Sequence, residues 1–356
     1  MSAKTVCTIV GARPQFIKAA PVSRALATSI REVMIHTGQH YDYGMSDVFF
    51  KEMEMRPPDY HLGAGGGTHG EQTAKMLIEI EKVLSTVKPD YVLVYGDTNS
   101  TLAGALAAAK AQTPLAHVEA GLRSFNRAMP EEINRVLTDH VSSLLFCPTD
   151  AAVENLAKEG ITRRVHRVGD VMYDALLHNL ELARKHSTIL QSLRLEKGNY
   201  ALATVHRAAN TDDPARMAAI LTALGLLSIQ IVFPVHPRTR KMIQEMDLPV
   251  SQNLMMIEPV GHFNVLILQE NANCILTDSG GMQKEAYLLG VRCITLREET
   301  EWVETVQAGW NQLSGVDVNA IRNTFEFWHP AGERPALYGN GRAAEEIGQI
   351  LCRELL

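Results

Sequence analysis

Short apolar runs rich in β-branched residues alternate with stretches of helical periodicity along the whole chain. In the first half, the runs that predict strands are Thr5–Val10, Val33–His36, Tyr91–Tyr95, Leu115–Glu119 and Leu144–Cys147. The helical patterns around them are Phe16–Leu26, Thr73–Leu84, Leu102–Ala111, Glu131–Val141 and Ala151–Glu159. Strands and helices that alternate in this way are typical of a parallel, doubly wound α/β sheet.

A second alternating set follows a helical segment, Met172–His186, and a polar stretch, Ser187–Asn199. Its predicted strands are Tyr200–Thr204, Ile229–Phe233, Leu254–Ile257, Cys274–Thr277 and Cys293–Leu296. We therefore predict two Rossmann-like domains, residues 1–186 and residues 187–341, with the final helix in 342–356 joining the first domain. Ligands of such sheets bind at the carboxyl ends of the strands, so we expect a site in a cleft between the domains.

Length and composition agree with a globular protein of two domains. The chain has 356 residues, of which 46% are hydrophobic and 21% charged. Its net charge of −6 argues against a nucleic-acid surface. No apolar run approaches membrane-spanning length, and the first residues lead into a strand instead of a signal peptide. We therefore expect a cytoplasmic protein whose partners include neither nucleic acid nor a membrane.

The sequence gives no indication of a metal or an organic cofactor. The five cysteines are scattered without a CxxC motif, which predicts reduced buried thiols and no zinc site. No pair of acids has a metal-ligand spacing, and no GxGxxG motif indicates a nicotinamide cofactor. We expect no cofactor.

One motif has the form of a phosphate site. The chain reads Thr-Asp-Ser-Gly-Gly-Met-Gln-Lys-Glu from Thr277 to Glu285, directly after an apolar run. A helix that begins at this point presents unpaired N–H groups and the positive end of its dipole. Ser279, Gly280 and Gly281 can therefore cradle a phosphate, with Glu285 one turn further along to contact a ribose. The alternative is an ordinary N-cap followed by a tight turn.

Cations and acids follow the strands of the first half. Arg13 and Lys18 lie at a predicted helix start, where their charge opposes the helix dipole unless an anion is bound. The acids Asp97, Glu119 and Glu131 each lie after a strand or at a helix start. Helix capping explains Asp97 and Glu131 one by one, but the three acids together can hold and move protons. Low-dielectric surroundings would raise their pKa values.

In the second half, His206-Arg207 and His236-Pro237-Arg238 again follow predicted strands closely. A single histidine in such a place is more often structural. Two of them beside arginines suit hydrogen bonding to a pyrophosphate or a sugar hydroxyl.

Together, these segments resemble the non-hydrolysing UDP-N-acetylglucosamine 2-epimerases. The matching pieces are Gly11-Ala12-Arg13-Pro14 with Lys18, Thr37-Gly38-Gln39-His40, Gly96-Asp97-Thr98, Glu119-Ala120-Gly121-Leu122-Arg123, Pro130-Glu131-Glu132-Ile133-Asn134-Arg135, Thr204-Val205-His206-Arg207, and Thr277-Asp278-Ser279-Gly280-Gly281 with Glu285. They span nearly the whole chain in the order of the family. The resemblance implies the glycosyltransferase-B architecture, a UDP-sugar substrate and a homodimer.

The resemblance also implies roles for individual residues. It places Ser279, Gly280 and Gly281 at the diphosphate and Glu285 at the ribose. Further contacts to the nucleotide sugar would come from Arg13, His206, Arg207 and His236. The acids of proton transfer would be Asp97, Glu119 and Glu131, with Lys18, Arg135 and His206 in the same catalytic group.

The implied reaction inverts C2 of the sugar without redox chemistry. A base removes the C2 proton while UDP leaves C1, which gives a glycal. UDP then returns to C1 as a proton is delivered to the opposite face of C2. The residues do not identify which carboxylate is the base.

Some residues depart from the common epimerase pattern. Ala12, Gln15 and Phe16 replace Thr, Glu and Ala, and Asp42 stands where substrate-activated members tend to carry Gln. We therefore do not expect activation by a second UDP-sugar. The start of the chain looks more like the branch that acts on UDP-2,3-diacetamido-2,3-dideoxyglucuronate, an O-antigen precursor, so this sugar and UDP-N-acetylglucosamine both stay open as substrates.

Two other functions fit part of the pattern. A glycosyltransferase of the same architecture would share the UDP site but need an acceptor groove. A UDP-sugar sensor would need the phosphate cradle but not the acids. The three acids at strand ends favour proton chemistry on the sugar itself.

Overall fold

The computed structural model describes residues 4–39, 55–248 and 250–355, which form two compact units. Unit 1 comprises Met1–Leu177 and Leu337–Leu356, and unit 2 comprises His178–Ala336. The division therefore falls within a helix at residue 177 and in the segment before residue 337, earlier than the positions 186 and 341 expected from composition. Of the residues selected from the sequence, His40 and Asp42 lie outside the described residues.

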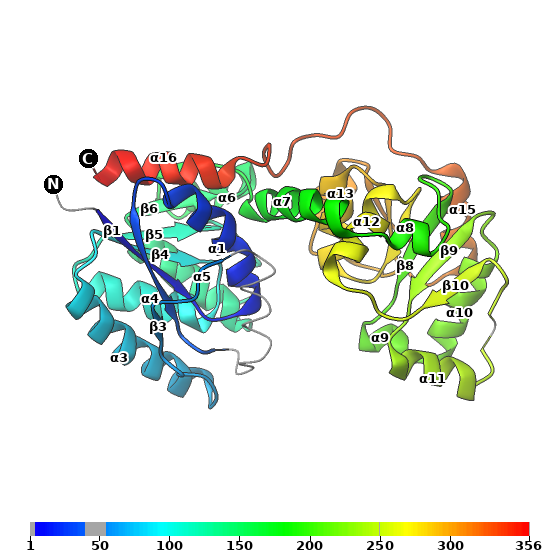
Figure 1. The fold of residues 1–356 in the computed structure, drawn as a ribbon, viewed down its shortest axis with the longest axis horizontal. Coiled ribbons are helices and arrows are strands. Elements are labelled where there is room, and N and C mark those ends of the chain that lie inside the picture. Colours follow the sequence, from blue (N-terminus) through cyan, green and yellow to red (C-terminus); the bar gives the residue numbers. More distant parts are fainter. Residues whose placement is uncertain (1–3, 40–54, 249, 356) are drawn as a thin grey trace. The chain divides into compact units, whose positions relative to one another are not determined.

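Unit 1 contains a parallel sheet of seven strands in the order β3-β2-β1-β4-β5-β6-β7 within the described residues. Its strands are β1 Thr5–Val10, β2 Arg31–His36, β3 Tyr60–His61, β4 Tyr91–Tyr95, β5 Leu115–Val118, β6 Leu144–Cys147 and β7 Val165–Arg167. Its helices are α1 Arg13–Leu26, α3 His69–Val87, α4 Asn99–Lys110, α5 Pro130–Val141, α6 Asp150–Lys158 and α16 Ala343–Leu355, and α7 Val171–His186 leads into unit 2. Helices cover both faces of the sheet (Figure 1).

Unit 2 contains a parallel sheet of six strands in the order β10-β9-β8-β11-β12-β13 within the described residues. Its strands are β8 Tyr200–Thr204, β9 Gln230–Pro234, β10 Leu254–Ile257, β11 Ile275–Thr277, β12 Cys293–Thr295 and β13 Asn311–Leu313. Its helices are α8 Ile189–Ser192, α9 Ala208–Thr211, α10 Pro214–Gly225, α11 Pro237–Glu245, α12 His262–Asn271, α13 Gly280–Leu289, α14 Val303–Gln307 and α15 Val318–Phe327. The predicted α/β class with two parallel sheets is confirmed.

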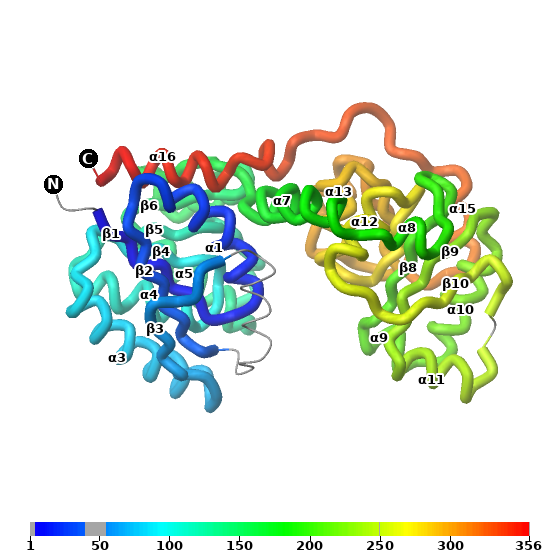
Figure 2. Tube along the Cα trace, viewed as in Figure 1, coloured from blue at the N-terminus to red at the C-terminus, as the bar shows by residue number. Residues whose placement is uncertain are grey.

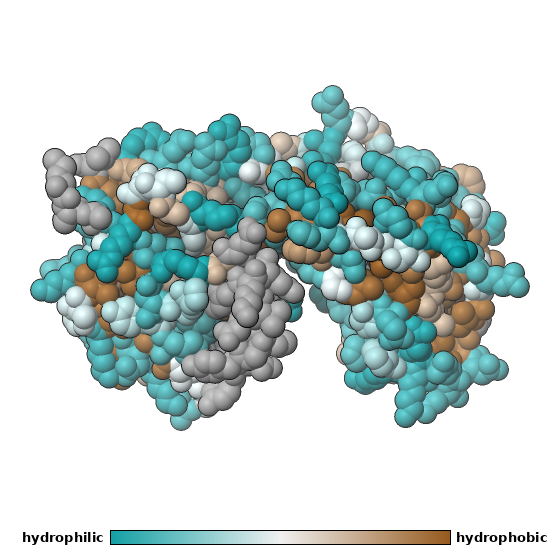
Figure 3. Space-filling model, in the orientation of Figure 1, coloured by the Kyte–Doolittle hydropathy of each residue, from teal (hydrophilic) through white to brown (hydrophobic). Residues whose placement is uncertain are grey.

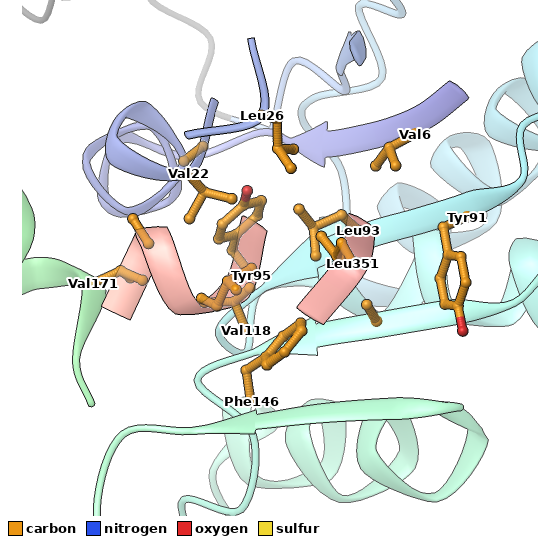
Figure 4. Packing of buried hydrophobic residues seen from close by; sticks show 14 of the residues in the cluster. Val6, Val22, Leu26, Tyr91, Leu93, Tyr95, Val118, Phe146, Val171 and Leu351 are labelled. Atoms are coloured by element: carbon orange, nitrogen blue, oxygen red, sulfur yellow. The ribbon is translucent and has the colours of Figure 1, made fainter. Parts of the chain in front are cut away.

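The alternation of side chains along the strands builds a core on each face of the unit 1 sheet. On one face, Leu93 and Tyr95 pack against Val22 of α1 and Leu351 of α16, as Figure 4 shows. On the other face, Val92 and its neighbours pack against α3 and α4. Each fully buried aliphatic side chain contributes about 2 kcal/mol by removal from water. The last helix of the chain is thereby part of unit 1, although more than 150 residues of unit 2 precede it, and Figure 2 follows this return of the trace.

Unit 2 is built in the same way. Ile231 and Phe233 of β9 face α10 and α15, while Val232 faces the opposite cluster with Leu268 of α12. The face drawn in Figure 3 is largely hydrophilic on both units. Among the described residues, no helix has the length and apolar character needed to cross a membrane.

Two glycines of unit 1 allow a test of how tightly the strand ends are packed. Gly121, three residues after β5, and Gly160, after α6, have φ angles of +80° and +81°. A Cβ atom at Gly121 would lie 2.3 Å from the carbonyl oxygen of Ala152, whereas a Cβ atom at Gly160 meets no described atom within 4 Å. The two positions share the backbone conformation and differ in free space.

We therefore expect Gly121→Ala to destabilise the protein more than Gly160→Ala. Both substitutions lower the free energy of unfolding by about 1 kcal/mol, because alanine disfavours the left-handed backbone conformation. Overpacking lowers it by about a further 1–3 kcal/mol in Gly121→Ala. Urea unfolding of both variants, followed by circular dichroism, measures the difference. Equal midpoints would contradict the close packing at the end of β5.

Candidate active site

Three neighbouring strands of unit 1 end at the same edge of the sheet. β1, β4 and β5 lie next to one another, and their first following residues are Gly11, Gly96 and Glu119. Parallel strands have their carboxyl ends on one edge, so these three turns come together there. Most of the polar residues selected from the first half of the sequence belong to these turns or to the helices after them.

Lys18 and Glu119 form an ion pair at this edge. The ammonium of Lys18, on α1, donates a short hydrogen bond to Oε2 of Glu119, and the two side chains are only 13% and 12% exposed. Burial opposes the charge on Lys18, but Glu119 and the nearby carboxylates of Asp97 and Asp170 outweigh it and raise the pKa of Lys18. A Cβ atom at Gly96 would lie within 3.2 Å of both charged groups, so glycine leaves the room for this pair.

The backbone of Glu119 supports a functional role for its side chain. Glu119 has a φ of +73°, in the left-handed region that non-glycine residues rarely adopt. Such strain is retained where the surrounding structure holds it, often at functional sites. Here the strained residue aims its carboxylate at Lys18.

Asp97 is held by the first turns of α5. Its carboxylate accepts a short hydrogen bond from Arg135, and its carbonyl oxygen accepts one from Asn134 Nδ2 at 2.9 Å. Arg135 also donates to Glu132 at 2.9 Å. Asp97 and Arg135 were both selected from the sequence, and the structure brings them together. The charge of Asp97 also contributes to the raised pKa of Lys18.

Glu131 and its neighbour Glu132 have different surroundings. Glu131 is exposed at the start of α5 and has no ion pair or side-chain hydrogen bond with the described residues. The buried residue is Glu132, whose carboxylate accepts from the backbone N–H groups of Ser124 and Phe125 at 2.8 and 2.9 Å. Burial opposes its charge, but these hydrogen bonds and Arg135 outweigh it and lower the pKa of Glu132. Glu132 thus fixes the loop before α5.

Gln15 organises the turn after β1, although the sequence marked it only as a departure from a pattern. Its Oε1 atom accepts from the N–H groups of Gly11 and Ala12 at 2.8 and 3.1 Å. Its amide nitrogen donates to the carbonyl of Tyr95 and to Thr101. An amide supplies both the acceptors and the donors that this buried position needs. Arg13 lies exposed at the first position of α1.

The predicted phosphate cradle forms at the start of α13 in unit 2. Ser279 is the N-cap and accepts from Met282 N–H at 3.4 Å. A Cβ atom at Gly280 would lie 1.8 Å from the carboxylate of Glu301, so this glycine makes room for an acid. At Gly281, only the Ser279 hydroxyl comes within 4 Å of such an atom among the described residues. The N-terminal turn is therefore open at Gly281 and occupied at Gly280.

Asp278 joins this cradle to His206 and Arg207. It is fully buried, and its carboxylate accepts from the N–H groups of His206 at 3.1 Å and Arg207 at 3.0 Å and from Asn210 Nδ2 at 3.0 Å. The imidazole of His206 is 59% exposed, with Nδ1 3.4 Å from Asp278. The sequence motif contained Asp278, but its partners lie in the turn after β8 and in α9, 68 to 72 residues earlier, so the motif alone did not assign it a role.

Arg207 extends toward Glu301, with 3.6 Å between guanidinium and carboxylate, and Arg297 donates to the same acid at 2.9 Å. Burial opposes the charge of Glu301, but its own N–H group and the two arginines lower its pKa. The carboxylate of Glu301 thus lies between two arginines at the start of α13. Two cations beside a helix N-terminus have the chemistry of an anion-binding site.

Glu285 and His236 lie apart from these contacts. Glu285, further along α13, accepts from Gln269 Nε2 at 2.7 Å, and burial raises its pKa while that hydrogen bond partly offsets the effect. His236 is the exposed N-cap of α11 and accepts from Arg238 N–H at 3.3 Å. No contact between the described residues joins His236 to Ser279 or Arg207. No group of three or more His, Cys, Asp or Glu residues in the described ranges is arranged to hold a metal ion.

Comparison with known proteins agrees with this arrangement. A family model described as UDP-N-acetylglucosamine 2-epimerase matches residues 24–352. The chain belongs to this family. It is therefore an isomerase of the epimerase type, and the resemblance inferred from the motifs is confirmed.

Curated relatives match over almost their entire length. A protein of Methanococcus maripaludis named UDP-N-acetylglucosamine 2-epimerase homolog is 52% identical over 97% of this chain and 99% of its own. The UDP-2,3-diacetamido-2,3-dideoxy-D-glucuronate 2-epimerase of Pseudomonas aeruginosa is 47% identical over 98% and 99%. Family membership thus holds for the whole chain of this epimerase.

Solved structures share the fold. The UDP-GlcNAc 2-epimerase of Methanocaldococcus jannaschii is 45% identical and has a TM-score of 0.89, with 98% of this chain and 99% of that chain covered. The same enzyme in complex with UDP-GlcNAc and UDP matches with a TM-score of 0.76, over 99% and 100% of the two chains. The architecture expected from the sequence is that of its structural neighbours.

The buried position of Asp278 gives a test of the cradle. In Asp278→Asn, an amide NH₂ would face the N–H groups that the carboxylate now accepts, so we expect a loss of about 1–3 kcal/mol. Release of the His206–Arg207 turn should also weaken UDP binding, measured by titration calorimetry. The matched control is Asp213→Asn, because Asp213 caps α10 through Ala215 N–H at 2.9 Å and asparagine caps equally well. Equal effects of the two substitutions would contradict the role of Asp278.

Proposed function

We propose that the protein inverts C2 of a UDP-2-acetamido sugar by elimination and re-addition of UDP, in the synthesis of cell-surface polysaccharide precursors. The observation that carries the proposal is the pairing of Lys18 with Glu119 beside Asp97 with Arg135 at the ends of adjacent strands. Two carboxylates, each hydrogen-bonded to a cation, supply a proton acceptor and a proton donor at one edge of a sheet. The names of the relatives support a UDP-sugar as substrate.

In this proposal, unit 2 binds the nucleotide. The diphosphate takes the open N-terminal turn at Gly281, with Ser279 and Gly280 beside it, and attracts Arg207 away from Glu301. Arg13, His206 and His236 make further contacts to the nucleotide sugar. The ribose hydroxyls donate to Glu285, whose present partner is a neutral amide.

Unit 1 carries the proton transfer. One carboxylate of the group Asp97, Glu119 and Glu131 removes the proton from C2, and the electron pair of that C–H bond forms the C1–C2 double bond. The C1–oxygen bond breaks at the same time, and its electrons leave with UDP. Re-addition reverses these changes with the proton placed on the other face of C2. Lys18 and Arg135 compensate the changing charge of the carboxylates, and cationic groups at the cradle stabilise the departing diphosphate.

Two substrates are in accord with the relatives. The 47% identical P. aeruginosa protein is named for UDP-2,3-diacetamido-2,3-dideoxy-D-glucuronate, and the M. jannaschii enzyme was crystallised with UDP-GlcNAc. From the residues after β1, we propose UDP-2,3-diacetamido-2,3-dideoxyglucuronate as the substrate, with UDP-GlcNAc as the competing substrate. The cytoplasmic location stays a prediction of the sequence.

We further propose that the protein is a homodimer that associates through α5. Phe125, Met129, Ile133 and Leu137 recur every four residues and are 74%, 38%, 47% and 43% exposed. Met129 is the N-cap of α5, and Ile133 and Leu137 lie within it, so these three form an apolar stripe on one face of the helix, with Phe125 in the loop before it. Exposed apolar stripes of this kind mark association surfaces. A second copy of the chain would cover it.

The proposed chemistry predicts exchange at C2. In deuterated water, the protein should place deuterium at C2 of one of the two UDP-sugars, as followed by proton NMR. Glu119→Gln should slow exchange by about 10²–10⁴-fold because the side chain no longer transfers a proton. UDP affinity should stay unchanged in this variant.

The matched control for this experiment is Glu154→Gln, which changes an exposed carboxylate on α6 and should exchange at the wild-type rate. Absence of exchange with both sugars would overturn the proposed function. Wild-type exchange in Glu119→Gln would exclude Glu119 from proton transfer.

The stripe on α5 predicts the effect of a charge on association. Leu137→Glu should weaken the dimer, since it would bury an unpaired carboxylate in an apolar interface. Analytical ultracentrifugation over a concentration series measures the shift toward monomer. Val303→Glu, at a 52% exposed position in unit 2, is the control and should leave the dimer intact. A wild-type monomer, or a dimer unaffected by Leu137→Glu, would contradict this interface.

A further inference from the structure

A buried histidine lies directly beneath the turn that carries Asp97. His117, on β5, is fully buried, and its Nε2 atom is 2.7 Å from the carbonyl oxygen of Gly96. Its Nδ1 atom is 2.7 Å from Oδ1 of Asp139, which is 1% exposed. A carbonyl oxygen only accepts hydrogen bonds, so Nε2 carries a proton.

The second nitrogen faces a carboxylate that is itself held by donors. Asp139 accepts through its other oxygen from Gly121 N–H at 3.1 Å and from Arg123 at 2.7 Å. Burial opposes the charge of Asp139, but His117 and Arg123 outweigh it and lower its pKa. The guanidinium of Arg123 pairs with this carboxylate, which is therefore ionised and only accepts, so Nδ1 carries a proton as well. With both nitrogens protonated, His117 is an imidazolium.

The network around this imidazolium balances its charge. Arg123, whose side chain is 1% exposed, also donates to both oxygens of Glu159, at 2.6 and 2.9 Å. Cations and anions therefore alternate from His117 through Asp139 and Arg123 to Glu159. A buried charge is tolerated when it is paired and hydrogen-bonded in this way.

This network contacts the backbone on both sides of the proposed proton-transfer groups. The carbonyl that His117 binds belongs to Gly96, the residue before Asp97, and Gly96 N–H donates to Val118 at 3.0 Å. The N–H that Asp139 binds belongs to Gly121, two residues after Glu119. The two turns that present the carboxylates are thus tied to a single ion pair below them.

We propose that His117 is a positioning residue, and that its imidazolium, paired with Asp139, sets the spacing of the Asp97 and Glu119 carboxylates. This assignment rests on the proposed C2 epimerisation, in which both carboxylates act on one sugar carbon. His117 does not touch the substrate and acts through the Gly96 carbonyl and the Gly121 N–H. A displacement of about 1 Å at such groups can lower turnover about 10²-fold.

Two substitutions in the full-length chain separate the two contacts of His117. In His117→Gln, the longer amide can still donate to Gly96, without the charge. In His117→Asn, the shorter amide can reach Asp139 but not Gly96. We expect kcat to fall about 100-fold in His117→Asn and less than 10-fold in His117→Gln, with KM and the affinity for UDP unchanged in both.

The result that overturns the proposal is a wild-type kcat in the folded His117→Asn protein, or equal losses in the two variants, because a purely structural histidine would lower the amount of folded protein and not its turnover. If His117→Asn does not fold, Asp139→Asn is the second variant. It retains an acceptor oxygen for Nδ1 and loses the oxygen that accepts from Gly121 N–H, and the same fall in kcat at constant KM is expected.

The charge of His117 has its own test in the wild-type protein. Nitrogen-15 NMR of the imidazole rings at pH 8 should show both nitrogens of His117 protonated, because each of them faces a hydrogen-bond acceptor. The signal is assigned by its loss in a His117 variant. A neutral ring at pH 8 would overturn the imidazolium. This readout needs no substrate, so it distinguishes failure of the network from failure of the proposed function.

Discussion

The turns that present the polar residues of this protein depend on buried aspartates that bind their backbone. In unit 1, Asp139 accepts from Gly121 N–H and from the imidazole that holds Gly96. In unit 2, Asp278 accepts from the N–H groups of His206 and Arg207. Turns at strand ends leave N–H groups without partners in the sheet, and a buried unpaired group costs about 1–3 kcal/mol. A carboxylate behind the turn satisfies them and fixes the direction of the residues in front.

The two units use this device for different chemistry. Unit 1 combines two carboxylates with two cations, Lys18 with Glu119 and Arg135 with Asp97, within one edge of its sheet. Unit 2 combines the open start of α13 with arginines around Glu301. Proton transfer and the binding of a leaving diphosphate have different electrostatic needs, and the proposed mechanism places them on separate sheets.

The sequence predicted the central strands well and the edges poorly. Predicted β1, β4, β6 and β8 coincide with the observed central strands, and β10 is an edge strand that was also predicted correctly. β3, β7 and β13, each at the edge of a sheet, were missed, because they have only two or three residues and no long apolar run. Central strands of a parallel sheet are buried on both faces and therefore read as apolar runs, whereas edge strands do not.

The residues of the candidate site were likewise predicted only in part. Lys18, Asp97 and Glu119 could be selected because charged residues directly after apolar runs are visible in the sequence. His117 and Asp139 could not, since their roles come from contacts between a strand and a helix more than 20 residues apart. The sequence predicted that the carboxylates lie in apolar surroundings. It did not indicate their ion pairs, because the order of the strands in the sheet determines which side chains meet.

The central claim is that UDP leaves C1, stays bound to the protein and returns to the same carbon. Substrate labelled with oxygen-18 in the bond between C1 and the β-phosphate tests it most directly. If UDP departs and rotates before it returns, the label should move from the bridging to the non-bridging β-phosphate positions in recovered UDP-sugar, at a rate that Glu119→Gln lowers. Epimerised sugar that retains all the label in the bridge would contradict the account.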